Sequence, residues 1–399
     1  MLRSLFSGIS GLRQHQTMMD VVGNNIANVN TIGFKSSAVV FEDTLSQTVR
    51  AASAPTVGGV GGLNPAQIGL GVQLGGISTN FGQGSAQTTN KSTDVMIQGD
   101  GFFVLSNGVE QLYSRAGAFT FDTNGYLVND QGMYVQGYPA SDGVVDTNAA
   151  VGNIRIPVGT MIPPAVSTSV TIAGNIDSSS TNNLTLGATA YDAKGTAHPL
   201  TITLTYDSSL PGYTIDVTDT SDGTTGTTGD ITWPAAGAPA TVNPADITLA
   251  DGTVVTMDLN AVTNYGGSQS LNVSATDGYP TGTLQQFKIE AAGTIVGVFS
   301  NGQKLNMAQI ALANFNNPAG LEKIGNTSFR STPNSGLAMV GTPSTGGRGQ
   351  LLSGANEMSN VDLGQEFTNL IIAQRGFQAN SRVITSSDEM LQDLVNIKR

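Results

Sequence analysis

The sequence has no cysteine, and only two histidines and one tryptophan among its 399 residues. The absence of cysteine excludes disulfides, thiolate metal sites, iron–sulfur clusters and cysteine nucleophiles. Charged residues make up only 12% of the chain, against a usual proportion of about 25%. Lysine and arginine number 17 and aspartate and glutamate 29, which gives a net charge of −12. This balance argues against a nucleic-acid partner, because nucleic acids bind basic surfaces.

Long apolar segments are also missing. No run of 18 or more apolar residues exists, so we expect no membrane insertion. Residues 1–8 lack the apolar core and small-residue cleavage site of a signal peptide. If the protein leaves the cell, we expect it to use a route that retains its N-terminus.

The sequence offers little for catalysis. The two histidines, His15 and His198, are too few for a multi-histidine metal site, and neither H-E-x-x-H nor G-x-S-x-G occurs. Walker A and G-x-G-x-x-G phosphate-binding motifs are also absent. His15 lies off the apolar positions described below and is expected to be exposed, while His198 precedes Pro199 in a predicted turn. We therefore predict no catalytic, cofactor-binding or metal-binding residues, and no enzyme.

The first thirty residues are typical of an amphipathic helix. Apolar residues recur in alternating steps of three and four, which is a narrow heptad stripe rather than a broad core face. Asparagines and Gly33 should end the helix within residues 28–33. We call its apolar positions the N-terminal row: Leu2, Leu5, Ile9, Leu12, Met19 and Ile26.

The last forty residues show the same pattern. The segment 359–362 matches the capping-box pattern S-x-x-D, which predicts the start of a helix. At 1.5 Å per residue, a helix of about 39 residues would be a rod roughly 58 Å long. Its apolar positions, the C-terminal row, are Leu363, Phe367, Leu370, Phe377, Ile384, Leu391 and Val395.

Between the two ends the apolar pattern changes to period two, which indicates strands. Asn107-Gly108, Asn124-Gly125 and Asn301-Gly302 are strong signals of hairpin turns. Residues 200–206 alternate between apolar and polar, as a half-buried strand does. Because residues 146–282 are enriched in threonine, aspartate and glycine, we interpret them as a separate β domain.

These patterns predict a mainly β chain with α-helical termini and a nested multidomain order. The two terminal helices would pair like a coiled coil, and an outer β-rich domain would be inserted into an inner one. The predicted parts are a terminal helical polymerisation domain (1–30 and 359–399), extended connectors (31–76 and 331–358), an inner β domain (77–145 and 283–330) and an inserted outer β domain (146–282).

Two interpretations of the apolar rows remain open. The helices could form an intramolecular coiled-coil stalk, or their rows could pack against neighbouring copies in a polymer. Glycines at positions 8, 11, 23, 364 and 376 each cost a helix about 1 kcal/mol relative to alanine. Because isolated helices are already marginal in water, we expect both ends to be largely disordered in the free monomer and to become ordered on assembly.

One segment carries a family resemblance. Residues 27–35 resemble the N-terminal signature A-N-x-N-T-x-G-[FY]-K of bacterial flagellar axial proteins, the family of rod, hook and junction subunits. Residues 94–105, 113–127 and 367–381 are similar to further segments of that family, so the resemblance covers about 1–145 and 284–399. The signature residues are Ala27, Asn28, Asn30, Thr31, Gly33, Phe34 and Lys35.

The resemblance implies a structural role without cofactors. Rod subunits of this family are shorter, and a chain near 400 residues with an insertion at 146–282 looks like the hook branch. That branch implies a curved helical tube of many copies, which acts as a universal joint between motor and filament. It also implies contacts with the hook cap, the distal rod and the hook–filament junction proteins, and passage through the flagellar type III export apparatus without a cleaved signal.

Three alternatives are kept. A distal-rod-type subunit would form straight rather than curved tubes. A secreted β-rich adhesin would have a cleavable signal and no use for terminal heptad rows. A β-rich hydrolase would need a carboxylate pair in a cleft, and no such pair is evident in the sequence. A variant lacking residues 1–30 would separate these classes, because only an axial subunit should lose polymerisation.

Overall fold

The computed structural model describes residues 2–55, 61–141, 143–157, 159–210, 212–233 and 240–397. The chain folds into two compact units. The first unit comprises residues 1–156, 288–296 and 306–399, and the second comprises 157–287 and 297–305. The described residues are mostly strands, with one long helix near each end, as the sequence predicts.

The two terminal helices are α1, Leu2–Ala27, and α2, Leu363–Ile397. Helix α1 ends before the asparagine-rich segment, as predicted. Helix α2 begins where the capping pattern placed it, but the capping residue is Asp362 rather than Ser359. The Asp362 Oδ1 accepts hydrogen bonds from the backbone N–H groups of Gly364 and Gln365, at 2.8 and 3.2 Å. Such a cap satisfies N–H groups that have no partner inside the helix.

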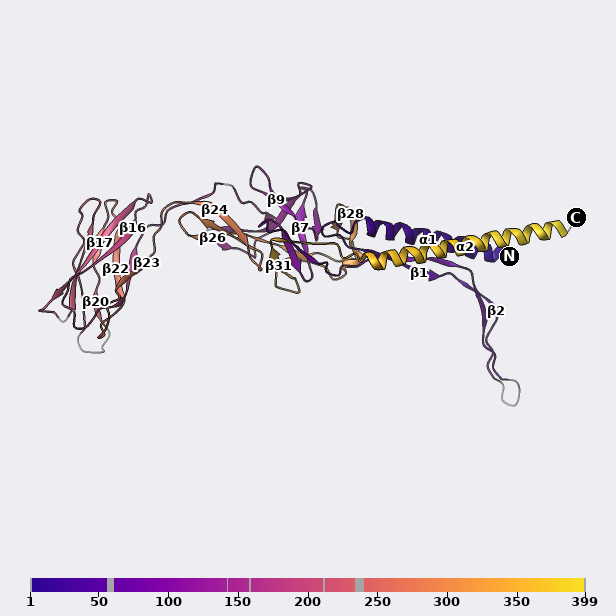
Figure 1. The fold of residues 1–399 in the computed structure, drawn as a ribbon, viewed down its shortest axis with the longest axis horizontal. Coiled ribbons are helices and arrows are strands. Elements are labelled where there is room, and N and C mark those ends of the chain that lie inside the picture. The colour runs from indigo at the N-terminus through magenta and orange to yellow at the C-terminus, as the bar shows by residue number, and fades with distance from the viewer. Residues whose placement is uncertain are drawn as a thin grey trace. The chain divides into compact units, whose positions relative to one another are not determined.

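The segment after α1, predicted as an extended connector, is paired into two antiparallel ladders. Strand β1 (Ser37–Asp43) pairs with β4 (Val72–Thr79), and β2 (Ser46–Arg50) pairs with β3 (Ala66–Gly69). The Ser10 hydroxyl of α1 accepts the backbone N–H of Val72 at 3.3 Å. The first ladder therefore lies against α1 (Figure 1).

The sheet of the first unit runs in the order β26-β11-β7-β8-β29-β28. The second predicted connector, residues 331–358, also supplies paired strands to this unit. Strand β27 pairs with β7 and β30, strand β6 with β31, and strand β5 with β32. The elements of this unit not yet given are β5 Ala86–Thr88, β6 Val95–Gln98, β7 Phe102–Ser106, β8 Gln111–Ser114, β9 Phe119–Phe121, β10 Leu127–Asn129, β11 Tyr134–Ser141, β12 Val144–Val145, β13 Gly152–Asn153, β27 Leu312–Asn314, the 3-10 helix η1 Pro318–Gly320, β28 Glu322–Gly325, β29 Ser328–Arg330, β30 Met339–Gly341, β31 Gln350–Ser353 and β32 Ala355–Glu357.

An aromatic cluster fills part of the core of the first unit. Phe102 on β7 meets Phe81 and Phe315 edge-on, with ring centroids 5.4 and 5.7 Å apart. The ring of Phe329 also lies 5.9 Å from Phe102. Edge-to-face pairs of this kind stabilise a core beyond simple burial of their area. The cluster fixes β29 against β7, and so holds the β28–β29 hairpin in place.

Three strands each pass from one unit to the other along the chain: β24 Gly282–Ile289, β25 Thr294–Phe299 and β26 Lys304–Ile310. Within the second unit, β14 (Met161–Ile162) pairs antiparallel with the start of β24. Ile162 is the direct partner of Gly282 in this ladder. Residues 163–281 therefore lie between two directly paired residues of this ladder.

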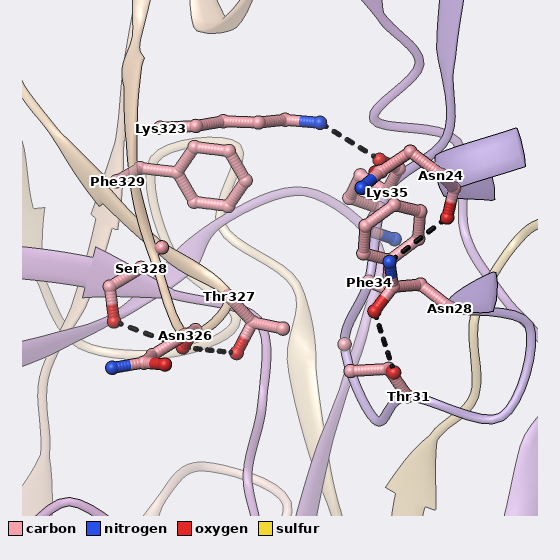
Figure 2. A pocket seen from close by; sticks show the side chains of 12 residues that line it. Asn24, Asn28, Thr31, Phe34, Lys35, Lys323, Asn326, Thr327, Ser328 and Phe329 are labelled. Carbon is pink, nitrogen blue, oxygen red and sulfur yellow. Dashed lines mark hydrogen bonds between the residues drawn. The ribbon is translucent and has the colours of Figure 1, made fainter. Parts of the chain in front are cut away.

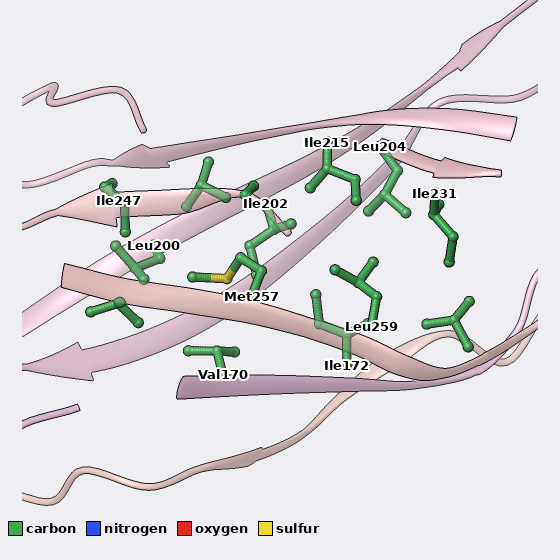
Figure 3. Close-up of a cluster of buried hydrophobic side chains, with 14 of the residues drawn as sticks. Val170, Ile172, Leu200, Ile202, Leu204, Ile215, Ile231, Ile247, Met257 and Leu259 are labelled. Carbon is green, nitrogen blue, oxygen red and sulfur yellow. The ribbon is translucent and has the colours of Figure 1, made fainter. Parts of the chain in front are cut away.

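Two sheets make up most of the second unit. One has the order β16-β17-β18-β19-β20 and the other β21-β22-β15-β23. Their inward-facing side chains form one buried cluster that includes Ile172, Ile202 and Leu259 (Figure 3). The strands are β15 Ser169–Asn175, β16 Leu184–Tyr191, β17 Ala197–Asp207, β18 Gly212–Asp219, β19 Gly229–Thr232, β20 Thr241–Asn243, β21 Asp246–Thr248, β22 Val254–Thr263 and β23 Asn272–Thr276.

Local sequence signals for turns and strands are confirmed. Gly108, Gly125 and Gly302 each have a positive φ, between 79° and 87°, in turns that join consecutive strands. Strand β17 contains the predicted segment 200–206 with the expected alternation of burial. The four-part domain division stays a prediction, since the first compact unit groups helices, connectors and inner β region together.

Candidate assembly site: the paired terminal helices and their junction

The two terminal helices pack against each other in antiparallel orientation. The hydroxyls of Ser4 and Ser387 lie 3.5 Å apart near one end of the pair. At the other end, the Asn25 Nδ2 donates to the Glu366 Oε1 at 3.0 Å. Residues near the start of α1 therefore face residues near the end of α2 (Figure 1).

Small and polar residues form much of the interface between the helices, and Ile384 of the C-terminal row packs against Gly8. A Cβ atom on Gly11 would lie 2.7 Å from the Asn380 Nδ2, and one on Gly376 would lie 2.4 Å from the His15 Cε1. Both distances are shorter than real Cβ contacts allow, so glycine is what permits this approach. Ala373 and Ser387 are buried on the same face of α2.

His15 is half-buried between α2 and the first ladder, which corrects the expectation of an exposed side chain. Its ring meets Phe41 of β1 edge-on, with centroids 5.9 Å apart. The expectation failed because His15 was judged against the apolar row, whereas the face through which the helices meet also includes polar and glycine positions outside the rows.

The apolar rows lie beside this interface. In the N-terminal row, Leu5, Ile9, Leu12, Met19 and Ile26 are half-buried; in the C-terminal row, Leu370, Ile384 and Leu391 are half-buried, whereas Leu363, Phe367 and Phe377 are exposed by 36–50%. Ile371 and Ile372 are likewise more than half exposed. The side chains of Leu2 and Val395 lie outside the described residues. Helix α2 thus presents large apolar side chains that α1 does not cover.

Two glycines in these helices should respond oppositely to alanine. We expect Gly376→Ala to destabilise the helix pair by about 1 kcal/mol, because the added methyl group displaces the His15 ring and the gain in helix propensity offsets only part of that cost. Gly23 has no atom within 4 Å of the position that a Cβ would take, so Gly23→Ala should stabilise α1 by up to about 1 kcal/mol. Both changes in stability can be measured from the denaturant concentration at which the assembled chain loses its helical circular dichroism signal. Equal shifts of the same sign would contradict the close approach at Gly376.

Beyond α1, the signature segment 27–35 forms a hydrogen-bonded turn. Ala27 is the last residue of the helix, and the Asn28 Nδ2 donates to the carbonyl oxygen of Asn24 at 2.9 Å. The Thr31 hydroxyl donates to the Asn28 Oδ1 at 3.0 Å. These bonds explain why asparagine and threonine occur at the end of the helix. Asn30 is exposed.

Gly33 lies where the turn touches two other segments. Its φ is +69°, in the left-handed region, and a Cβ would lie 2.5 Å from the backbone nitrogen of Ala116. Its N–H donates to the carbonyl oxygen of Glu357 at 2.8 Å, just before α2. The conformation and the space both require glycine.

Lys35 is buried and joins the start of the chain to its end. Its ammonium group donates to the Glu357 Oε1 at 2.6 Å and to the carbonyl oxygen of Gly82 at 2.8 Å. Neither the Lys35 nor the Glu357 side chain has measurable exposure. The same Oε1 accepts the N–H of Gly84 at 2.9 Å. A buried charge must be paired and hydrogen-bonded in this way to be tolerated.

Arg115 adds a second cation beside the same carboxylate. Its Nη1 lies 3.6 Å from the Glu357 Oε2 and donates to the carbonyl oxygen of Gly99 at 2.8 Å. Burial lowers the pKa of both Lys35 and Arg115 from their ordinary values, and the charge of Glu357 opposes the shift in each case. We call Lys35, Glu357 and Arg115 the junction cluster.

Polar side chains around the cluster connect the ends of both helices. The Asn360 Oδ1 accepts the N–H of Ser36 at 2.9 Å, and its Nδ2 donates to the carbonyl oxygen of Asn80 at 2.8 Å. The Asn25 Oδ1 accepts the N–H of Ser37 at 3.0 Å. Sequence reasoning missed Asn25, Arg115, Glu357 and Asn360. The available signal was that Glu357 is the only acidic residue between residues 331 and 361.

A recess of about 420 Å³ adjoins the junction (Figure 2). One wall is the end of α1 with the signature turn, and the other is the β28–β29 hairpin. The rings of Phe34 and Phe329 come from opposite walls, and Lys323 lies at the rim. The Lys323 ammonium donates to the Ser37 hydroxyl at 2.8 Å and lies 5.3 Å from the centre of the Phe34 ring.

His198 lies in the second unit beside a serine and two carboxylates, but not in a catalytic geometry. Its Nδ1 is 2.7 Å from the Asp219 Oδ2 and 3.5 Å from the Ser221 hydroxyl, and its Nε2 is 3.9 Å from the Asp192 Oδ2. A serine-type triad needs the hydroxyl and the carboxylate on opposite ring nitrogens. The Ser221 hydroxyl instead donates to Asp219 at 2.6 Å, so the group links β17 to the turn after β18.

Further chemistry is sparse in the parts of the chain that the structure describes. Among those residues, no three histidine, aspartate or glutamate side chains gather as a metal site would require. Neither α1 nor α2, as far as each is described, is long and apolar enough to cross a membrane. The paired helices and their junction are therefore the candidate site that the described residues offer.

Comparisons with known proteins match these same elements. Family profiles described as "Flagella basal body rod protein", "Flagellar hook protein FlgE/F/G D1 domain" and "Flagellar basal body rod FlgEFG protein C-terminal" match residues 5–35, 96–178 and 352–397. The flagellar hook protein of Treponema pallidum is 37% identical, and that of Borreliella burgdorferi 38% identical, over the whole of each chain. The chain belongs to the flagellar hook protein family.

The solved structure of a Helicobacter pylori flagellar hook protein shares the fold. Its TM-score is 0.53 at 16% identity, and the match covers 66% of this chain and 98% of that one. The Treponema pallidum and Borreliella burgdorferi relatives, which match over their full length, are hook proteins. This chain is therefore a structural subunit of the flagellar hook. It is exported to the flagellum and polymerises there. The rod and adhesin alternatives are not favoured.

The junction cluster joins two of the segments that the family profiles match. The first matched segment contains Lys35 and the last contains Glu357, although the two residues are 322 positions apart. Their buried ion pair is thus one of the contacts that hold two separate family segments of a hook subunit together, beside the packing of α1 on α2.

Proposed function

We propose that the apolar rows of α1 and α2 are the surfaces through which copies of this hook subunit pack into a curved tube. The observation that carries the proposal is the outward direction of large apolar side chains on α2. Leu363, Phe367, Ile371 and Ile372 are 40–54% exposed, while the contact with α1 is made by other residues of α2, among them Gly376, Asn380 and Ile384. Neighbouring exposed apolar side chains mark interaction surfaces. A heptad stripe of such side chains packs well against another helix.

Negative-stain electron microscopy after salt-induced polymerisation tests this proposal. We expect the full chain to form curved tubes and the variant lacking residues 1–30 to form none, because α1 would be missing from the wall. Phe367→Ser with Ile371→Ser should also prevent tubes, whereas Thr368→Ser, an exposed change between them, should not. Straight tubes would indicate a rod-type subunit, and polymers from the truncated chain would contradict the role of α1.

Hydrogen exchange separates the assembly interpretation from the stalk interpretation. We expect amides of α1 and α2 to exchange quickly in the free monomer and to be protected in the polymer, since folding would be coupled to assembly. Protection of both helices in a persistent monomer would support an intramolecular stalk instead.

The second unit would control curvature rather than assembly. Its threonine- and aspartate-rich surface favours wet, weak contacts that can break and re-form as the tube bends, while the axial helices carry torque. Because Ile162 and Gly282 are direct partners, residues 163–281 can be replaced by Asn-Gly, a turn that favours hairpins. We expect this variant to polymerise but to lose stable curvature in electron micrographs. Curved tubes from it would overturn this role.

The remaining partners follow from the same role. The hook cap would cover the growing end, and the distal rod and hook–filament junction proteins would contact the two ends of the tube. Export through the flagellar type III apparatus would leave the N-terminus uncleaved, since α1 is needed in the tube wall. Mass spectrometry of assembled hooks tests the last point, because a shortened N-terminus would contradict it.

A further inference from the structure

The recess beside the signature turn has the form of a docking site. It is about 420 Å³, within the range of ligand pockets. The half-buried ring of Phe34 supplies accessible apolar surface, while Asn24 and Asn326 present amide groups and the core residue Phe329 closes the back of the recess (Figure 2). An apolar side chain with polar neighbours would match this lining.

The β28–β29 turn that forms one wall is strained. Asn326 and Thr327 have φ values of +53° and +55°, and Gly325 before them has +97°. A β-branched residue such as threonine rarely adopts this conformation. The turn is held by the Ser114 hydroxyl, which donates to the carbonyl oxygen of Thr327 at 3.0 Å. Strain that is held in place by surrounding contacts is typical of binding sites.

The recess also carries a positive charge without a counter-ion. Among the described residues, Lys323 forms no ion pair, and its ammonium group is held by the Ser37 hydroxyl and the carbonyl oxygen of Lys35. Burial lowers the pKa of Lys323, as expected for a cation that lacks a carboxylate neighbour. A carboxylate on the occupant would complete the site.

One segment of this chain has the complementary chemistry. Leu45, in the turn between β1 and β2, is 85% exposed. Asp43, two residues earlier, is exposed and forms no ion pair among the described residues. The turn is fixed, because the N–H and hydroxyl of Thr44 both donate to the carbonyl oxygen of Gly71, at 3.0 and 3.1 Å.

Other protruding apolar residues fit less well. Val109 is 95% exposed, but the neighbouring Glu110 is already paired with Arg330 at 2.8 Å. Leu337 is 91% exposed, and no acidic residue lies within ten positions of it. Of these three, only the turn at Leu45 combines a projecting apolar side chain with a carboxylate that has no ion-pair partner among the described residues.

The turn cannot reach the recess of its own chain. Ser37, the first residue of β1, contacts Lys323 at the rim, and β1 continues in extended conformation, with one register shift after Val40, to Asp43. Six strand residues at about 3.3 Å each separate Asp43 from the recess by about 20 Å. The occupant must therefore come from a second copy.

We propose that Leu45 of one copy docks in this recess against Phe34 of a neighbouring copy, with Asp43 facing Lys323. The inference rests on the proposed assembly and deepens it, because it assigns the recess built by the signature turn to a contact between copies. It links the first β ladder of one subunit to the junction of the next.

Cysteine pairs test this contact, since the chain contains no cysteine of its own. We expect Leu45→Cys combined with Asn24→Cys to give disulfide-linked dimers and longer ladders in oxidised polymers, and none in the monomer. Each single variant should stay free of ladders. The control pair Val109→Cys with Asn24→Cys should give none either. Normal tubes without a ladder from the first pair, or an equal ladder from the control pair, would overturn the inference.

A second measurement needs no cross-link. Leu45→Ser should raise the protein concentration needed for polymerisation about tenfold, because a buried leucine is lost from each contact. Val109→Ser, at an equally exposed tip, should leave that concentration unchanged. Equal behaviour of the two variants would contradict the docking of Leu45. If the unsubstituted chain forms no polymer at all, the proposed assembly itself fails, and this inference fails with it.

Discussion

Replacing Lys35 with methionine is expected to lower the free energy of unfolding of the first unit by about 3–5 kcal/mol. Lys35 and Glu357 have no exposed side-chain surface, so the substitution leaves a carboxylate in the core with its main counter-ion removed. The remaining cation, Arg115, lies 3.6 Å from the other oxygen of Glu357 and cannot replace the 2.6 Å hydrogen bond.

Denaturant unfolding can assign this loss to the first unit. Far-UV circular dichroism follows the whole chain, while the single tryptophan, Trp233, packs against the core of the second unit and reports on that unit alone. We expect the Trp233 transition to stay unchanged. Arg330→Met is the matched control, because its ion pair with Glu110 is about 40% exposed and water screens such pairs, so that they contribute little to stability. If both variants lost similar free energy of unfolding, burial of the Lys35–Glu357 pair would not be the reason for its contribution to stability.

Replacing Gly33 with alanine should be nearly as damaging, with a loss of at least about 2 kcal/mol. The left-handed conformation alone costs a non-glycine residue about 1–2 kcal/mol. The added Cβ would also lie 2.5 Å from the backbone nitrogen of Ala116, which no side-chain rotation can relieve. Relaxation would move the turn and weaken the hydrogen bond from Gly33 to Glu357.

Gly108→Ala separates the two causes. Gly108 also has a positive φ, of +87°, but a Cβ there would meet no atom within 4 Å. The stability lost in Gly108→Ala should therefore reflect the backbone conformation alone and amount to about 1 kcal/mol. The same denaturant experiment compares both variants. If Gly33→Ala cost no more than Gly108→Ala, the close contact with Ala116 would not be what requires glycine in the signature.

Local features of the fold could be predicted because they depend on neighbouring residues. The end of α1 at Ala27 follows from asparagines that bind their own backbone, and the Asn-Gly turns follow from the left-handed preference of glycine. The alternation in β17 likewise follows from one half-buried face. In each case the decisive interactions lie within a few residues of one another.

The interface between α1 and α2 could not be predicted from apolar periodicity. A search for large apolar residues selects side chains such as Phe367, but the helices meet where Gly11 and Gly376 allow close approach. Glycine carries no hydrophobic signal, so its role depends on which residue of the partner helix faces it. That information belongs to the pairing of two segments and not to either one alone.

The junction cluster was half predictable. The family resemblance singled out Lys35 and Gly33, but their common partner, Glu357, lies in a segment predicted as a connector. The strand pairing within the predicted connector 31–76 was not foreseen for a related reason. The glycine-rich composition of that connector suggested an unpaired chain, whereas the pairing of β1 with β4 depends on a register that joins residues up to 42 positions apart.

The separation of Lys35 and Glu357 along the chain also bears on the order of folding. Bringing residues 322 positions apart into contact closes a very long loop, and the entropy lost in doing so rises with loop length. Folding of the intervening strands shortens that loop before the contact is made. Since non-local contacts form slowly, the junction closes late. We therefore expect the helices that depend on it to be the last part of the subunit to fold.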